Sequence, residues 1–482
     1  MTCGSVKNAC GQETICCGLF VRRIESAAVP ASVTQVFSEQ KFASILGGNN
    51  AYRESNRFST WAAEPVEVFE VGPSREAVFS RLAEILARYE LCGSSDEPIP
   101  AGMFCCGWIG YFGYELGRSI EKVSAGAVDD LGLPVIRLSF YDRAVCFDHN
   151  TKTWFLSALR MPDDTEPIEA KLDHLASLIK RAEGVVVREY PAGQLDDIDV
   201  SKLRCNMNRD YYFDALKRIR KYIYDGDVYQ INFSQRFECD YTSDAIDLYH
   251  WQNEYNPSPY AAYVDAGDFA IVSASPEMFV TIADGVISTK PIKGTRPRLG
   301  NAAGAEEINQ RNFTELVESE KDQAELNMII DLERNDLTRI CEYGSIKVVQ
   351  PRTIEAYPTV FHAVATIEGR LREGRLATGF CDILKAMFPG GSITGAPKIR
   401  SMEIIDELEP TARSVYTGSI GFLGIDGTAS LNIAIRTVIV KGKSAYVQTG
   451  GGIVADSDPN AEWEETITKA RALLAGITAV NA

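Results

Sequence analysis

The sequence predicts a globular protein that combines antiparallel strands with long helices. Of its 482 residues, 45% are hydrophobic and 24% are charged, the ordinary composition of a soluble chain with ample material for a core. Short alternating strands dominate residues 1–185, and a hairpin follows between residues 269 and 298. Segments with helical spacing lie between and after these strands. The length gives a prior of about three domains, or two large ones.

The overall charge argues against several classes of partner. The net charge is −17 and the isoelectric point is about 4.9, so neither nucleic acid nor an anionic membrane is expected as the main partner. The most apolar stretch, 101–114, is too short and glycine-rich to span a bilayer, and the N-terminus shows no secretory signal pattern. The twelve cysteines form no Cys-x-x-Cys pair, so we expect reduced thiols and a cytoplasmic protein.

Taken in order, residues 1–185 form the first predicted region. Its expected strands are 66–71, 136–140, 144–148 and 154–158, and its expected helices are 74–90 and 166–183. The glycine and aromatic residues of 107–117 favour a strand or turn where backbones approach closely. Residues 193–204 are a candidate linker. The second region begins near residue 206, with a helix around 211–223 and a turn into a strand at 226–235.

The hairpin brings an amine close to a carboxylic acid. Residues 271–282 are predicted as one strand, and Asp284-Gly285 is the two-residue turn. Counting outward from the turn places Lys293 one step from Glu277, and Pro291 interrupts the ladder there. The two side chains could serve as a nucleophile and its acid–base partner. The alternative is a salt bridge at the edge of the sheet.

Two predicted helices, 314–337 and the one that begins after Asp458-Pro459, each carry an acidic pair. Each pair is spaced three residues apart, which places both carboxylates on one helix face. The four acids are Asp322 and Glu325 in the first helix, and Glu462 and Glu465 in the second. If the pairs face one another they would repel unless a cation lies between them, and an all-oxygen donor set suits Mg²⁺. The alternative is two solvated charged faces, with Glu465 paired to Lys469.

Three further features could bind an anion. The glycine-rich turn 388–398 leads into a helix, whose terminus presents free N–H groups. Arg436 ends the apolar run 431–435, and a buried arginine needs a carboxylate from the protein or from a ligand. Bare amides at Gly450–Gly452 could receive a carboxylate, although a turn or a β-bulge would also explain glycines there.

Four longer motifs, in the same order along the chain, resemble those of the chorismate-utilising enzymes. They are Pro291–Thr295, Asp331–Asp336, Phe388–Lys398 and Gly451–Ser457. That family includes component I of anthranilate synthase and of aminodeoxychorismate synthase, together with the isochorismate and salicylate synthases. The similarity is dense over residues 206–482, which are expected to be the chorismate-binding catalytic region. It is looser over residues 1–185, which look like the family's N-terminal region.

The resemblance implies an α+β fold in which two large antiparallel sheets pack as a sandwich with helices around them. It also implies chorismate as the ligand and Mg²⁺ as the cofactor. By position, the direct metal ligands are Glu325 and Glu465, with Asp322 and Glu462 behind them. The residues that match groups around chorismate are Arg436, Gly451, Gly452, Lys469, His362, Thr295 and Thr394. A single histidine in an apolar strand, such as His362, is more often a core residue.

Two positions select a branch of the family. Anthranilate synthases carry alanine where Lys293 stands, whereas lysine there marks the aminodeoxychorismate synthases. The isochorismate and salicylate branch has a lysine base at the position of Gln230, and an amide is not a base at neutral pH. The resemblance thus implies amination of chorismate at C4, in which Lys293 attacks C2 and Glu277 protonates the departing hydroxyl. Lys293 must be neutral to attack, so we expect a lowered pKa.

The resemblance also bears on partners and on regulation. The sequence has no Gly-x-Cys-x-Gly nucleophile turn, so we expect ammonia to come from a separate glutamine amidotransferase subunit, in the synthesis of 4-aminobenzoate and folate. Relatives bind tryptophan between two segments that match partly here, and the candidate residues are Glu25, Ser26, Pro257 and Tyr260. Two other hypotheses are an anthranilate synthase component I and a non-catalytic regulator that binds chorismate or tryptophan.

Overall fold

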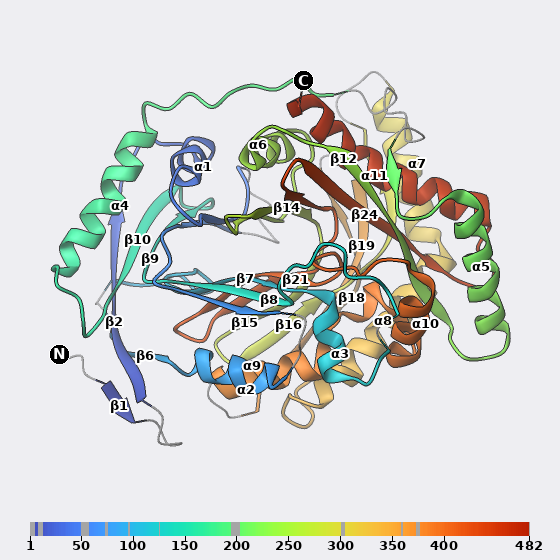
Figure 1. The fold of residues 1–482 in the computed structure, drawn as a ribbon, viewed down its shortest axis with the longest axis horizontal. Coiled ribbons are helices and arrows are strands. Elements are labelled where there is room, and N and C mark those ends of the chain that lie inside the picture. Colours follow the sequence, from blue (N-terminus) through green and yellow to red (C-terminus); the bar gives the residue numbers. More distant parts are fainter. Residues whose placement is uncertain are drawn as a thin grey trace.

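Two large sheets lie face to face, and helices cover their outer faces (Figure 1). The computed structural model describes residues 5–7, 13–49, 57–72, 76–94, 97–124, 126–193, 203–299, 304–357, 360–372 and 376–481. Between the sheets, Ala62 and Ala144 of one sheet pack with Ile109 and Phe422 of the other. The predicted α+β sandwich of two large antiparallel sheets is therefore confirmed.

The larger sheet has 14 strands within the described residues, and all but one of its pairings are antiparallel. Its main path, in spatial order, is β1 (Ser5–Lys7), β2 (Glu13–Ile24), β10 (Thr153–Arg160), β9 (Arg143–Asp148), β4 (Phe58–Ala62), β3 (Ser44–Leu46), β13 (Tyr260–Asp265), β14 (Phe269–Ser275), β23 (Thr437–Lys441), β24 (Ser444–Ile453), β12 (Gln230–Asp240) and β11 (Arg204–Cys205). Two further strands join it, namely β6 (Tyr89–Ser94) beside β2, in parallel, and β20 (Gly395–Ala396) beside β12.

The smaller sheet has 10 strands within the described residues. Its spatial order is β17 (Ile292–Pro297), β19 (Val360–Arg370), β16 (Val286–Lys290), β15 (Met278–Ala283), β22 (Ala429–Asn432), β21 (Ser419–Gly424), β7 (Gly107–Phe112), β8 (Ile136–Tyr141) and β5 (Glu67–Val71), and β18 (Lys347–Ala356) also pairs with β19. The close approach expected at 107–117 is present in β7. A side chain at Gly110 would meet the Arg137 carbonyl oxygen at 2.0 Å.

Strands from the two predicted regions share both sheets. In the larger sheet β3 pairs with β13, and in the smaller sheet β7 pairs with β21. Residues 1–185 and 206–482 therefore contribute to one continuous pair of sheets. The boundary between them stays a prediction.

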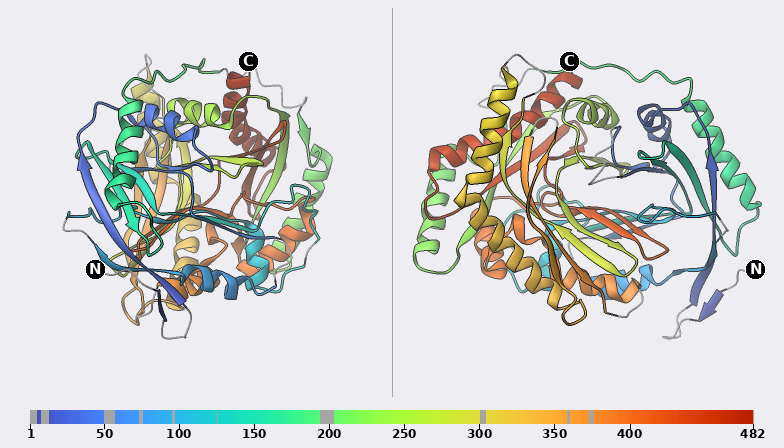
Figure 2. Two further views of the ribbon diagram at one scale, coloured as in Figure 1. Left: turned by 60° about the vertical axis from the view of Figure 1, so that its left-hand side comes forward. Right: turned by 180° about the vertical axis from the view of Figure 1, so that it is seen from behind.

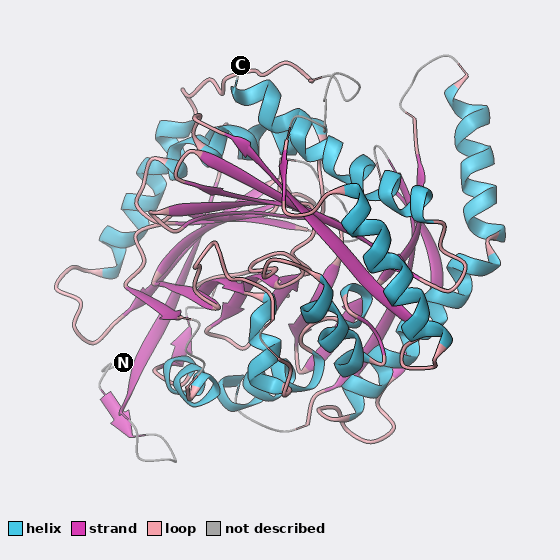
Figure 3. Cartoon of the chain, turned by 45° about the vertical axis from the view of Figure 1, so that its right-hand side comes forward, coloured by secondary structure: helices cyan, strands magenta, loops and turns pink. Residues whose placement is uncertain are grey.

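The helices follow the sheets on the outside (Figures 2 and 3). They are α1 (Pro30–Ser38), α2 (Val78–Leu86), α3 (Gly117–Ile120), α4 (Ile168–Ala182), α5 (Arg209–Tyr224), α6 (Ala245–Tyr255), α7 (Ala305–Glu318), α8 (Glu320–Thr338), α9 (Leu376–Met387), α10 (Lys398–Leu408) and α11 (Pro459–Asn481). The contacts of α4, α6 and α11 are with the larger sheet, and α8 lies on β17 and β19 of the smaller one.

The single helix predicted over 314–337 is wrong in one respect. The helix is interrupted at Ser319, which ends α7 and caps α8. The Ser319 hydroxyl accepts a hydrogen bond from the Asp322 amide at 3.2 Å. A serine that competes for backbone groups favours such a boundary over a helix interior. Because of the break, both acids of the first pair lie in the opening turns of α8.

The second acidic pair follows a helix start that the sequence predicts well. The Asp458 carboxylate accepts hydrogen bonds from the amides of Asn460 and Ala461, and α11 begins at Pro459.

We expect Asp458→Ala to lower the free energy of unfolding by about 1 kcal/mol. Urea denaturation measures this change. Asp456→Ala, two residues earlier and also exposed, is the control, and an equal loss in both variants would contradict the capping role.

The expectation that all cysteines are reduced is wrong at one pair. Cys16 and Cys92 form a disulfide with their Cα atoms 5.6 Å apart, and it joins β2 to its parallel neighbour β6. The pairing brings together residues 76 positions apart, so no local spacing predicts it.

Within the described part of the chain, none of the helices combines the length and the apolar character needed to cross a bilayer.

Candidate active site

Two segments of the chain each pass from one sheet into the other, and they do so side by side. The segment predicted as one strand over 271–282 is divided between β14 in the larger sheet and β15 in the smaller, with Pro276 and Glu277 at the crossing. The segment that contains the apolar run 431–435 is divided in the same way, between β22 and β23, and Arg436 ends the crossing with a φ of 49°. Since β14 pairs with β23 and β15 with β22, the two crossings lie side by side.

Backbone hydrogen bonds join the crossings. The Ile433 amide donates to the Glu277 carbonyl at 3.0 Å, and the Ala274 amide donates to the Arg436 carbonyl at 3.0 Å. Proline at 276 cannot donate to a ladder, which is consistent with the end of β14 at this point. The crossings thus fix Glu277 and Arg436 at the seam between the two sheets.

Lys293 and Glu277 meet at a third residue, Ser392. Lys293 lies in β17, at an irregular pairing with β19 between Ile292 and Thr295. Its ammonium nitrogen donates to the Ser392 carbonyl at 3.1 Å, and the Ser392 side chain hydrogen-bonds Glu277. Among the described ion pairs there is none between Lys293 and Glu277, so the alternative of an edge salt bridge is not what the structure contains.

Burial moves the two pKa values toward one another. Removal from water raises the pKa of the Glu277 carboxyl, against the opposing effects of Ser392 and the Lys293 charge. Removal from water lowers the pKa of Lys293, although the Glu325 and Glu277 carboxylates oppose it. An acid and an amine shifted in these directions favour a protonated Glu277 and a neutral Lys293. Such a pair is the chemistry of a nucleophile with an adjacent proton donor.

The two acidic pairs lie close to this amine. The charges of Glu325 on α8, and of Glu465 and Lys469 on α11, all act on Lys293. Lys321 of α8 lies 3.9 Å from the Glu325 carboxylate and also acts on Glu465 across the gap between the helices. The acids therefore gather around several ammonium groups at one place.

The acids of the two pairs differ in their partners. Burial raises the pKa of Glu462, and the neighbouring Glu465 charge adds to this rise, while the Ser457 hydroxyl donates to Glu462 at 2.7 Å. Burial also acts to raise the pKa of Glu465, but Lys469, at 2.7 Å, lowers it below the usual value. Asp322 pairs with Arg296 at 3.0 Å. Among the described residues, no three acidic, cysteine or histidine side chains converge as a metal-binding group.

Arg436 is a cation without a protein counter-ion among the described residues. Burial alone acts on its guanidinium, and it lowers the pKa. Its neighbour His362, in β19, is buried with one ring nitrogen unpartnered, and burial together with the Arg436 charge lowers the pKa of this imidazole to about 3. Nδ1 of His362 lies 2.8 Å from the Thr295 hydroxyl. A neutral histidine and a bare guanidinium at one place are suited to an anionic ligand.

The three glycines Gly450–Gly452 belong to a regular strand and not to a turn or a bulge. They lie in β24, where Gly451 is opposite Phe233 of β12. A side chain at Gly451 would lie 3.0 Å from the Glu462 carboxylate, and one at Gly452 would lie 2.5 Å from the Gln230 amide nitrogen. Glycine is therefore required so that these groups can approach the strand.

One edge of this glycine segment has no strand beside it. The pairing of β23 with β24 extends only to Val447, so the far edge of 448–453 has no strand partner among the described residues. Lys469 closes part of that region by donating to the Gly450 carbonyl at 2.8 Å. Amides along such an edge could receive an anion, and that role of Gly451 and Gly452 stays a prediction.

Part of the glycine-rich turn 388–398 is held by the protein itself, and an anion at the start of α10 stays a prediction. The Thr394 hydroxyl is buried and donates to the Gly390 carbonyl at 3.0 Å, and the Gly391 amide donates to the Glu333 carboxylate at 3.2 Å. The turn is therefore held by the protein itself and delivers Ser392 to Lys293. Sequence reasoning missed Ser392 and Glu333. The signal for Glu333 was an acid on the apolar stripe of α8, where Leu326, Ile330 and Leu337 are buried.

A family model described as "chorismate binding enzyme" matches residues 45–475. The chain belongs to the chorismate-binding enzyme family. It is 39% identical over 403 residues to anthranilate synthase component 1 of Pseudomonas aeruginosa, which covers 82% of this chain and 78% of the relative. It is 36% identical over 429 residues to aminodeoxychorismate synthase component 1 of Escherichia coli, which covers 89% and 86%.

Solved structures of the family share the architecture. Anthranilate synthase component I from Streptococcus pneumoniae superposes with a TM-score of 0.71 at 31% identity, covering 89% of this chain and 94% of the other. A menaquinone-specific isochorismate synthase from Escherichia coli superposes with a TM-score of 0.68 at 16% identity, covering 96% of this chain and 95% of the other. This second match shows a likeness of fold alone. The scaffold therefore occurs in proteins named for different reactions.

The residues predicted for a tryptophan pocket do not bond to one another. Ser26 donates to Glu183 at 2.8 Å, and Glu25 is exposed. Tyr260 belongs to β13 and borders a small cavity of about 80 Å³ that neither Ser26 nor Pro257 lines. Among the described residues, no hydrogen bond or ion pair links the segment at Glu25 to the loop before Tyr260. The pocket itself stays a prediction.

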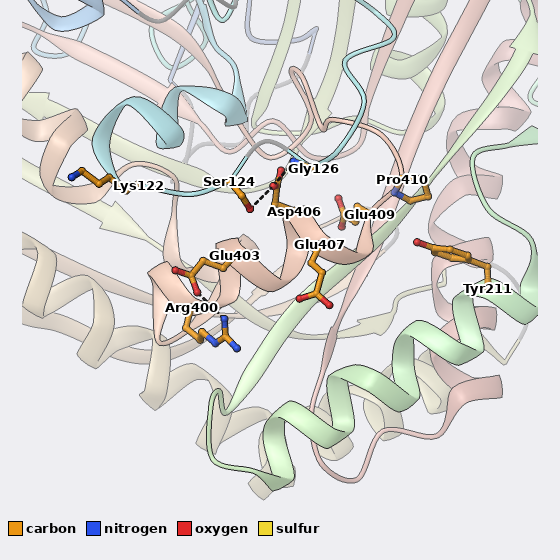
Figure 4. A pocket seen from close by; sticks show the side chains of 10 residues that line it. All are labelled: Lys122, Ser124, Gly126, Tyr211, Arg400, Glu403, Asp406, Glu407, Glu409 and Pro410. Carbon is orange, nitrogen blue, oxygen red and sulfur yellow. Dashed lines mark hydrogen bonds and ion pairs between the residues drawn. The ribbon is translucent and has the colours of Figure 1, made fainter.

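The surface cavity in Figure 4 lies apart from the residues predicted for this family's active site. It measures about 660 Å³ and is lined by ten residues from α5, from α10 and the two positions after it, and from the segment after α3. None of them belongs to the predicted site. Within it, the Asp406 carboxylate accepts hydrogen bonds from the Ser124 hydroxyl and the Gly126 amide (Figure 4). These bonds fasten the segment after α3 to α10 and are a structural feature.

For this chorismate-binding enzyme we expect Arg436→Leu to raise the KM for chorismate by about 10- to 100-fold, the worth of a hydrogen-bonded charge pair. The physical reason is that the guanidinium has no counter-ion among the described residues, so an anionic ligand supplies it. For the same reason, thermal stability should hold or rise. Steady-state kinetics and thermal melts measure both. Arg436→Lys keeps the charge and should fall between, whereas an unchanged KM in Arg436→Leu would remove Arg436 from the ligand site.

Proposed function

We propose that this enzyme aminates chorismate at C4 with ammonia and releases 4-amino-4-deoxychorismate and water. One observation carries the proposal: Lys293 and Glu277 share Ser392, and burial lowers the pKa of one and raises that of the other. Binding alone requires no amine activated in this way, which argues against a non-catalytic regulator. The relatives named aminodeoxychorismate synthase support the same reading.

In the proposed reaction the neutral Lys293 amine forms a bond to C2 of chorismate. The ring double bonds shift, the C4–O bond breaks, and the hydroxyl leaves as water with the proton of Glu277. Ammonia then adds to C4, the double bonds shift back, and the C2–N bond to Lys293 breaks. The proton lost by the incoming nitrogen returns to the Glu277 carboxylate. The covalent step divides one difficult displacement into two easier ones.

The charged groups around the amine fit a dianionic ligand and a divalent cation. Arg436, the open edge at Gly451 and Gly452, and Lys469 would hold carboxylates of chorismate. Glu325 and Glu465 would hold Mg²⁺, with Glu462 behind them, because both carboxylates act on Lys293 and both lie within reach of the Lys321 charge. When bound, the ion would supply positive charge to a carboxylate of the substrate. Asp322 is engaged by Arg296 and fits a supporting position.

Product identity tests the proposal. The purified chain is incubated with chorismate, Mg²⁺ and ammonium at alkaline pH, and the products are separated and weighed by mass spectrometry. We expect 4-amino-4-deoxychorismate. The relatives named anthranilate synthase favour a second candidate, anthranilate formation, and that product is fluorescent. Anthranilate as the main product would overturn the proposal, and so would the absence of any aminated product.

We also propose a separate glutamine amidotransferase as the source of ammonia. The motivating observation is that the sequence lacks the nucleophile turn Gly-x-Cys-x-Gly. Glutamine in place of ammonium should therefore give no product with the purified chain. Adding a cognate amidotransferase should restore the reaction, which mass spectrometry with ¹⁵N-amide glutamine can follow. Glutamine-dependent turnover by the chain alone would contradict this source.

A further inference from the structure

Glu333 lies on a helix of the smaller sheet's outer layer, yet it faces inward toward the loop that carries Ser392. It occupies the apolar stripe of α8 and is 3% exposed. One carboxylate oxygen accepts the Gly391 amide at 3.2 Å, and the other oxygen is buried without a hydrogen-bond partner among the described residues. A buried acid in this position costs free energy, so it calls for a function.

The neighbouring acid on α8 is satisfied in a different way. Asp336 forms an ion pair of 2.6 Å with Lys398, whose ammonium also donates to the Met387 carbonyl at 2.9 Å. Among the described residues, Glu333 has no ion pair, although the Lys398 charge acts to lower its pKa. Burial and the Asp336 charge raise the pKa of Glu333 to about 7. A carboxyl with this pKa is partly protonated near neutral pH, which reduces the buried charge that accompanies its contact with the Gly391 amide.

The loop held by Glu333 touches both reacting groups. Gly391 precedes Ser392, whose carbonyl accepts from Lys293 and whose side chain hydrogen-bonds Glu277. Gly391 admits this contact because a side chain there would lie 3.1 Å from the Glu333 carboxylate and 2.5 Å from Leu332. We propose that Glu333 is a positioning residue, which fixes the Gly391–Ser392 loop and thereby holds Lys293 and Glu277 in register for amination.

The proposal rests on the proposed function for its kinetic test, and it has a second test that does not. Glu333→Leu removes the acceptor at similar volume, whereas Glu333→Gln keeps a carbonyl oxygen for the Gly391 amide. We expect Glu333→Leu to lower kcat about 100-fold, the order expected for a misplaced reacting group, with little change in the KM for chorismate. Glu333→Gln should retain most of kcat.

The second test measures the amine without turnover. Reductive methylation of the folded protein at several pH values, with peptide mapping, gives the apparent pKa of Lys293. Release of the loop in Glu333→Leu should admit water and raise the pKa of Lys293. At a fixed pH below that pKa, each unit of rise lowers the neutral fraction of the amine about tenfold. Asp406→Asn, which alters another buried carboxylate that accepts a glycine amide, is the matched control and should change neither readout.

The outcomes separate the proposals. A lowered kcat and a raised Lys293 pKa in Glu333→Leu, with both restored in Glu333→Gln, support positioning. Wild-type values in Glu333→Leu, or equal losses in Leu and Gln, overturn it, and thermal melts establish that each variant is folded. If the wild-type chain forms no aminodeoxychorismate, the proposed function fails, while the labelling comparison still decides the role of Glu333.

Discussion

Lys293→Ala is expected to lower C4 amination by about 10³-fold or more, the order lost with a catalytic group. The variant keeps Arg436 and the open edge of β24, so chorismate should still bind. Without the lysine adduct, ammonia can reach C2 directly. The product should therefore shift toward 2-amino-2-deoxyisochorismate or anthranilate, which mass spectrometry and fluorescence distinguish.

The same reasoning fixes the controls and the pH dependence. Lys293→Arg should do no better than alanine, because a guanidinium stays protonated. Lys347→Ala, at an exposed lysine of β18, should behave as wild type. Since burial lowers the Lys293 pKa, wild-type activity should rise with pH through a value below the ordinary 10.5. Burial raises the pKa of Glu277, which extends the pH range over which this acid keeps its proton. Near wild-type C4 amination in Lys293→Ala would disprove the covalent route.

Glu465→Gln is expected to raise the Mg²⁺ concentration needed for half-maximal turnover by about 100-fold, since one ligand of the proposed ion is lost. The Glu465 side chain is 52% exposed, and its ion pair within the described residues is with Lys469, so the melting temperature should change little. Turnover across a Mg²⁺ series, and calorimetric titration with chorismate present, measure the change. Glu325→Gln should behave in the same way.

Glu464→Gln is the matched control. Glu464 is an exposed neighbour on α11, and this substitution removes one negative charge from the same helical turn. It should retain the wild-type Mg²⁺ dependence. If Glu464→Gln and Glu465→Gln respond equally, the effect is one of general charge, and Glu465 is not a ligand.

Local patterns predicted most of the elements and several site residues. The turn Asp284-Gly285 and the cap Asp458 came from residue types that a backbone conformation demands, and both are present. The hairpin geometry and the resemblance of Pro291–Thr295 to a family motif singled out Lys293, which the structure places beside Ser392. Such signals involve neighbours in sequence, where the chemistry of a few residues decides the outcome.

The sequence could not show where a strand changes sheets. An apolar, β-branched run such as 271–282 satisfies the pattern of one long strand, and the crossing at Pro276-Glu277 depends on what packs on each side. The contact of Ser392 with both Lys293 and Glu277, and the disulfide of Cys16 with Cys92, likewise join residues far apart along the chain. Periodicity contains no information on these pairings.

The sharing of both sheets by the two halves of the chain has a consequence for folding. Ile45 pairs with Tyr263, and Ile109 pairs with Phe422, so the contact order is high and the chain is expected to fold slowly. Residues 206–482 expressed alone would leave β13 and β21 as bare edges open to aggregation. The seam that holds Glu277 and Arg436 is built by β14, β15, β22 and β23, all within residues 206–482. The N-terminal strands β3 and β7 close the two sheet edges beside it, so we expect the isolated C-terminal half to be limited by association through those edges.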